Sequence, residues 1–121
     1  MAGFKRFEDI KAWQKAREVT REIYRVTAIG DFSKDYDLRS QIRRASISIM
    51  ANIAEGFGRK SDKEFANFLN IAHASACEAQ SHLYVALDLN YTNQQSFDNL
   101  YQSLVEITRM IYALSEHLRK S

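Results

Sequence analysis

The sequence predicts an all-α fold, an up-down-up-down four-helix bundle formed as a single domain over residues 1–121. The chain contains no proline and only four glycines, so few positions force a corner and long helices are favoured. Apolar residues recur at three- and four-residue spacing along four segments, which is the spacing of one face of an α-helix. Short polar stretches separate these segments, as expected for antiparallel neighbours in a bundle.

The first helix is predicted at about residues 8–28, with Gly30 suited to its C-terminal exit. Its apolar side chains fall on one side of a helical projection, opposite a charged side: Ala12, Trp13, Ala16, Val19, Ile23 and Val26. The polar stretch Asp31–Asp37 then predicts a loop, because its residues favour caps and turns.

The second helix, at about residues 36–55, is apolar on more than one face. A main stripe is formed by Leu38, Ile42, Ala45, Ile49 and Ile53. A bundle cannot cover every face of one of its helices, so the surplus predicts a second buried surface against another subunit. The predicted oligomer interface consists of Ile47, Met50, Ala51, Ala54 and Phe57.

The third and fourth helices are predicted at about residues 62–89 and 93–118. Ser61 followed three residues later by Glu64 is a capping-box pattern, and Thr92 with Gln95 is a second one. The third helix has a core stripe whose middle is small, which allows close approach of a neighbour: Phe65, Phe68, Leu69, Ala72, Ala76, Ala79, Leu83 and Leu87. The fourth has the regular 3-4 spacing of a bundle seam: Phe97, Leu100, Leu104, Ile107, Ile111, Leu114 and Leu118.

Basic charge is concentrated in the first half of the chain. Residues 1–60 hold 13 Lys/Arg against 8 Asp/Glu, whereas residues 61–121 hold 4 against 7. One interpretation is a phosphate-contacting surface repeated around an oligomer, formed by Arg39, Arg43, Arg44, Arg59, Lys60 and Lys63. The other is a solvated face that pairs with acids of the chain or of another subunit. Tyr36 and Phe57 lie beside these cations and could stack on bases.

No pattern for catalysis, a metal or a cofactor is found, so we expect neither an enzyme nor a bound cofactor. His73 and His82 project from opposite sides of one helix, so they cannot share a metal. Cys77 is expected to be a buried packing thiol without a histidine to act as its base. The Gly56-Phe57-Gly58 segment follows a helix instead of a strand, so it does not fit a dinucleotide loop.

The sequence is that expected of a soluble cytoplasmic protein with no membrane segment. Its N-terminus lacks the apolar stretch of a signal peptide, and no segment reaches the roughly 18–20 apolar residues that cross a bilayer. A single cysteine excludes an internal disulfide and is compatible with a reducing compartment.

Three stretches of the sequence are similar to one bacterial family of four-helix bundles, the 23S rRNA-intervening sequence proteins. They are residues 7–16 (FEDIKAWQKA), residues 38–59 with LRSQIRRA and ANIAEGFGR, and residues 61–72 (SDKEFANFLNIA). The chain departs from the family pattern in having Met50 in place of proline. It also has Gln80 in place of a second acid after Glu78, which weakens any role that needs two carboxylates.

The resemblance implies a homopentameric ring of bundles related to the accessory variability determinants of diversity-generating retroelements. It implies binding of RNA or DNA and assistance to a reverse transcriptase. The alternative is a protein–protein interaction module without nucleic-acid binding. In both hypotheses the protein is a non-catalytic scaffold.

Overall fold

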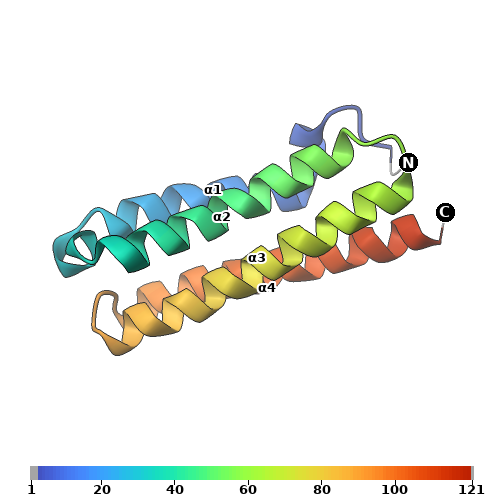
Figure 1. Cartoon of the computed structure of the whole chain (residues 1–121). Helices are drawn as coiled ribbons and strands as arrows, with labels where there is room; N and C mark the ends of the chain where they lie inside the picture. The colour runs from blue at the N-terminus through green and yellow to red at the C-terminus, as the bar shows by residue number, and fades with distance from the viewer. Residues whose placement is uncertain (1–2, 121) are drawn as a thin grey trace.

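A computed structural model describes residues 3–120 as four long helices, with no strand in that range. A 3-10 turn, η1 (Phe7–Asp9), precedes α1 (Lys11–Thr27), and a second one, η2 (Gly30–Lys34), precedes α2 (Tyr36–Phe57). The two remaining helices are α3 (Asp62–Asp88) and α4 (Gln94–Arg119). Consecutive helices run antiparallel and pack side by side, and α4 also packs against α1 to close the bundle (Figure 1). The predicted four-helix bundle is confirmed.

The bundle has two ends that differ in charge. The N-terminal segment, the α2–α3 turn and the end of α4 lie together at one end, while η2 and the α3–α4 turn lie at the other (Figure 1). The first, which we name the basic end, comprises residues 3–11, 55–67 and 114–120 and holds 8 Lys/Arg against 6 Asp/Glu. The second, the acidic end, comprises residues 28–39 and 86–98 and holds 2 against 5.

The core consists of the apolar stripes expected from the sequence. The largest side chains that are less than 2% exposed come from all four α-helices, from η2 and from Ile10 between η1 and α1. They include Ile10, Ile23, Phe32, Ile49, Phe65, Leu83, Leu104 and Ile111. Five residues that the sequence also assigned to the core are only half-buried: Trp13, Val26, Phe68, Leu87 and Leu114. All of the buried side-chain nitrogen and oxygen atoms described have hydrogen-bond partners, as a stable interior requires.

The packing of α2 against α3 depends on Gly56. A Cβ at this position would lie 2.6 Å from the Cβ of Phe68 and 3.0 Å from the Cδ1 of Phe65. Only a glycine therefore lets the last turn of α2 come this close to the first turns of α3. The two helices are also joined by a 2.7 Å hydrogen bond between the Ser48 and Ser75 hydroxyls.

Local capping signals explain several of the helix boundaries. The Ser61 hydroxyl accepts a hydrogen bond from the Glu64 amide at 3.1 Å, which confirms the predicted cap of α3. At the end of α3, the Tyr91 amide donates to Ala86 O and the Asn90 amide to Leu87 O, with Asn90 at φ 60°. This is a Schellman motif, and asparagine tolerates its left-handed position better than most residues.

Two predicted boundaries are wrong. The first α-helix begins at Lys11 and not near residue 8, because Ile10 is extended (φ −77°, ψ 119°) and is buried in the core. The fourth helix is capped by Asn93 and not by Thr92: the Asn93 side-chain oxygen accepts from the Ser96 amide at 2.8 Å. Within residues 3–120, the helices lack a stretch long and apolar enough to span a membrane.

Candidate nucleic-acid and subunit interfaces

Two of the arginines predicted to bind phosphate make contacts within the chain that connect its helices. The Arg43 Nε donates to Thr27 Oγ1 at 2.8 Å, and its guanidinium lies 4.4 Å from the centre of the Tyr24 ring. Arg39 donates to the Ser33 carbonyl at 2.7 Å and lies 4.8 Å from the Tyr36 ring centre. Both side chains are half-buried and connect α2 to the end of α1 and to η2. Their hydrogen-bonding capacity is therefore partly used within the chain.

The other four cations are more available. Arg44, Lys60 and Lys63 are exposed and have no acidic partner among residues 3–120. Arg59 pairs with Glu55 at 3.0 Å on the surface, where an ion pair contributes little to stability. Its guanidinium also lies 4.6 Å from the Phe68 ring centre, which fixes its direction.

The six cations do not form one patch. Arg39, Arg43 and Arg44 lie on the first half of α2, and Arg59, Lys60 and Lys63 lie at the basic end. At a rise of about 1.5 Å per residue, Arg43 and Arg59 are roughly 24 Å apart along the helix axis. The second group adjoins Arg119, which with Lys63 lines a hollow of about 430 Å³ between α3 and α4. A polyanion that used one surface of a single chain would contact the basic end.

The predicted subunit-interface residues divide in the same way. Ile47 is 44% exposed and Ala51 is exposed, whereas Ala54 is half-buried. Met50 and Phe57 pack against the core, and the Phe57 ring meets Phe65 edge-to-face at 6.1 Å. The outward apolar face of α2 is therefore narrower than its sequence indicates, because the bundle itself covers Met50 and Phe57.

A neighbouring part of α3 widens this apolar face again. The hydrogen bond between Ser48 and Ser75 shows that these two residues lie opposite each other on α2 and α3. Because the helices are antiparallel, the residue one turn after Ser48 on α2 lies opposite the residue one turn before Ser75 on α3. Ile71, which is 49% exposed, thus comes level with Ala51. Ala74, which precedes Ser75 on α3, is exposed as well, and we name Ile47, Ala51, Ile71 and Ala74 the α2–α3 strip. Ile71 was not among the residues expected from the sequence, although its place off the stripe of the third helix was a usable signal.

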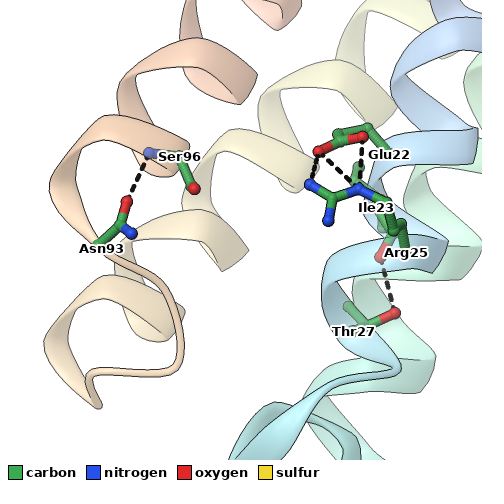
Figure 2. A network of polar contacts seen from close by, with 6 residues as sticks. All are labelled: Glu22, Ile23, Arg25, Thr27, Asn93 and Ser96. Atoms are coloured by element: carbon green, nitrogen blue, oxygen red, sulfur yellow. Dashed lines mark hydrogen bonds and ion pairs between the residues drawn. The ribbon is translucent and has the colours of Figure 1, made fainter.

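The groove between α1 and α4 is polar and nearly neutral. A hollow of about 440 Å³ is lined by charged residues of α1 and by Ser96, Asn99 and Ser103 of α4. Within it, Glu22 and Arg25 form a two-pronged ion pair on one turn of α1, facing the cap of α4 formed by Asn93 and Ser96 (Figure 2). The hydrogen bonds from Arg25 lower the pKa of Glu22, and those same bonds raise the pKa of Arg25. Three cations and two acids line this groove, so it offers a polyanion little surplus positive charge.

The histidines and the cysteine differ in part from what the sequence suggests. Both expectations for Cys77 are wrong: the thiol is exposed and not buried, and a histidine does lie beside it, with Nδ1 of His73 3.8 Å from its Sγ. His82 instead contacts Glu78 at 3.1 Å. No group of three or more metal-ligating side chains occurs within residues 3–120.

The fold and these surfaces define a small α-helical bundle with a basic end and an exposed apolar strip. Residues 8–113 match the 23S rRNA-intervening sequence protein family, so the chain belongs to that family. It is similar to a crystal structure from Bacteroides thetaiotaomicron VPI-5482, described as a protein with unknown function from the S23 ribosomal protein family. The TM-score is 0.78 at 25% identity, over 86% of this chain and 97% of that one. A search of the curated proteins gives no match.

Proposed function

We propose that this chain is a non-catalytic scaffold that assembles as a homo-oligomeric ring, a pentamer, and binds RNA or DNA through its basic end. The observation that carries the proposal is that an apolar surface and a basic surface lie on different parts of the bundle. The α2–α3 strip offers apolar area for a second copy, and the basic end offers cations without acidic partners in the described chain. Each surface would remain available while the other is in use.

The apolar strip supports the assembly. Ile47 and Ile71 are nearly half exposed in a single chain, and burying such side chains stabilises an interface by about 25 cal/mol per Å² of apolar area. Ile47→Asp with Ile71→Asp should dissociate the oligomer in analytical ultracentrifugation. Tyr112→Asp, which changes an exposed side chain on α4, is the control and should leave the mass unchanged. A wild-type chain that sediments as a monomer would refute the assembly.

The basic end supports nucleic-acid binding. Lys60 and Lys63 can each neutralise a phosphate, and removing one such cation should reduce the slope of log K against log salt by about 0.7 to 0.9. Lys60→Glu/Lys63→Glu should therefore weaken the binding of a labelled single-stranded RNA and a DNA duplex and flatten their salt dependence. The measurement is fluorescence anisotropy over a salt series.

A matched control has the same change in net charge elsewhere on the chain. Arg21→Glu/Lys34→Glu replaces two exposed cations away from the basic end. It should bind nucleic acid nearly as well as the wild type. Equal losses of affinity for both variants would contradict a site at the basic end, and unchanged binding by Lys60→Glu/Lys63→Glu would contradict the function.

The family resemblance extends the proposal to an accessory role for a reverse transcriptase of a diversity-generating retroelement. A reverse-transcriptase gene with a variable repeat beside the gene for this chain would support it. The second candidate is a protein-interaction module in a cytoplasmic assembly. It is favoured by Arg39 and Arg43, whose bonds within the chain reduce the cations available for phosphate.

A further inference from the structure

We infer that the acidic end of the bundle is a docking surface for a Lys/Arg-rich segment of a partner protein that also carries apolar side chains. Five aspartates lie at this end: Asp31, Asp35, Asp37, Asp88 and Asp98. A nucleic acid would be repelled there, so the surface suits a different partner from the one proposed for the basic end.

The acidic end also exposes three large apolar side chains. Ile29 is 58% exposed, Tyr36 69% and Leu89 51%. Ile29 and Leu89 lie in the two connections at this end, one between α1 and α2 and one between α3 and α4, and Tyr36 is the first residue of α2 (Figure 1). Exposed apolar groups framed by charge are characteristic of protein-binding surfaces.

Two adjoining hollows give this end a shape that can receive side chains. One, of about 550 Å³, includes Ile29, and the other, of about 650 Å³, includes Tyr36. Asp31 and Tyr91 line both. The wall between the two hollows is held in place by Tyr91. Its ring stacks on Phe32 at 5.3 Å, and its hydroxyl donates to Asp35 at 3.0 Å.

The nearby cations leave the negative charge largely uncompensated. Arg39 is directed to the Ser33 carbonyl and the Tyr36 ring, and Arg25 is paired with Glu22. Lys34 approaches Asp31 only to 4.0 Å, with both side chains about four-fifths exposed. An incoming lysine or arginine can thus meet a carboxylate while an adjacent apolar side chain enters a hollow.

A second copy of this chain is a poorer occupant. The basic end could supply cations, but none of the large apolar side chains described as exposed belongs to it. Contact between copies through opposite ends would therefore leave the hollows around Ile29 and Tyr36 unfilled. The combination of charge and apolar area requires a segment that carries both.

The test uses the full chain and a fluorescein-labelled peptide of alternating lysine and leucine, about a dozen residues long, as a minimal basic and apolar strand. Peptides of alternating lysine and serine and of alternating glutamate and leucine are the comparisons. Only the lysine–leucine peptide should bind well in fluorescence anisotropy. Amide shift changes in NMR spectra should fall on residues 29–37 and 88–93.

Two variants locate the site. Asp31→Asn/Asp37→Asn should weaken binding about tenfold, since it removes two exposed carboxylates that can pair with lysines of the peptide. Tyr36→Ser should weaken it because the variant removes an apolar ring from the surface. Asp9→Asn/Glu116→Gln changes net charge equally at the basic end and should alter binding less than about twofold, because distant charges are screened.

Three results would overturn the inference. They are equal binding of the lysine–serine peptide, equal weakening by the control variant, and concentration-dependent shifts at the acidic end without any peptide, which would indicate a second copy. The Asp31→Asn/Asp37→Asn variant should still bind RNA as the wild type does. Loss of peptide binding and loss of nucleic-acid binding are thereby distinguished.

Discussion

The Nε of Arg43 on α2 donates a 2.8 Å hydrogen bond to the hydroxyl of Thr27, the last residue of α1. Thr27 is fully buried, and its hydroxyl in turn donates a 2.7 Å hydrogen bond to the Ile23 carbonyl. Arg43 also reaches the Tyr24 carbonyl at 3.4 Å. A side chain that sequence reasoning assigned to phosphate thus fixes the C-terminal turn of α1, where a positive charge is favourable.

We predict that Arg43→Met destabilises the chain by about 1–2 kcal/mol. A hydrogen bond from a charged group contributes roughly 1.5–3 kcal/mol, and partial exposure reduces this through screening. Urea denaturation measures the loss. The control is Arg44→Met, whose exposed side chain has no polar partner among residues 3–120 and should matter little. A double-mutant cycle with Thr27→Val should show coupling of at least about 0.5 kcal/mol. Additive losses would mean that the bond is not formed in solution.

The two glycines that flank Phe57 should respond differently to substitution. Gly56→Ala adds a methyl group 2.6 Å from the Phe68 Cβ, so α2 and α3 must move apart at an expected cost of about 1–3 kcal/mol. At Gly58 the nearest atom lies at 3.4 Å, and its φ of −74° suits any residue. Gly58→Ala should therefore be neutral or stabilising by up to about 1 kcal/mol. Equal melting temperatures for the two variants would contradict this packing.

The fold could be predicted because its signals are local and repeated. Most residues of the four predicted stripes are buried, and the Ser61–Glu64 cap is formed as expected. The predicted helix boundaries were wrong where two local signals competed or where tertiary packing determined the position of the helix end. Thr92 and Asn93 are both good caps, and only the chain path out of the Schellman turn selects Asn93.

The surfaces were harder to predict because they depend on neighbours that one helix cannot reveal. Met50 lies off the main stripe of α2 but is covered by the rest of the bundle. Arg39 and Arg43 lie in a basic run, yet the partners that occupy them belong to η2 and α1. The apolar and acidic residues of this bundle end come from two segments, residues 28–39 and 86–98, which are about half the sequence apart, so no single sequence window contains them.

Cys77 should react with a thiol reagent in the native protein. Its side chain is exposed on α3, so no unfolding is needed for access, in contrast to the buried thiol that the sequence suggested. One equivalent of Ellman's reagent per chain should be consumed without denaturant at a rate close to that in urea. Cys77→Ser should abolish the signal and leave the melting temperature unchanged, because the side chain does not belong to the core. Slow labelling that follows the unfolding rate would show that Cys77 is covered in solution.

The hydrogen bond between Tyr91 and Asp35 should make stability depend on pH in the alkaline range. Donation to the Asp35 carboxylate favours the protonated phenol and raises the pKa of Tyr91 above its ordinary value. The stabilisation is therefore complete below a pH of about 10, the value for an unfolded tyrosine, and is lost as the pH rises through the higher folded value. Tyr91→Phe should melt below the wild type at about pH 8, and the difference should shrink as the pH passes 10.

The control for the tyrosine experiment is Tyr112→Phe, which removes a hydroxyl from a side chain that is 63% exposed. It should melt with the wild type at every pH. A second tyrosine contributes to the alkaline decline of the wild type itself, because a hydrogen bond with Tyr84 raises the pKa of Tyr101. That contribution is common to the wild type and Tyr91→Phe, so it cancels in their difference. A difference that stays constant from about pH 8 to 11 would mean that Asp35 does not hold the Tyr91 proton.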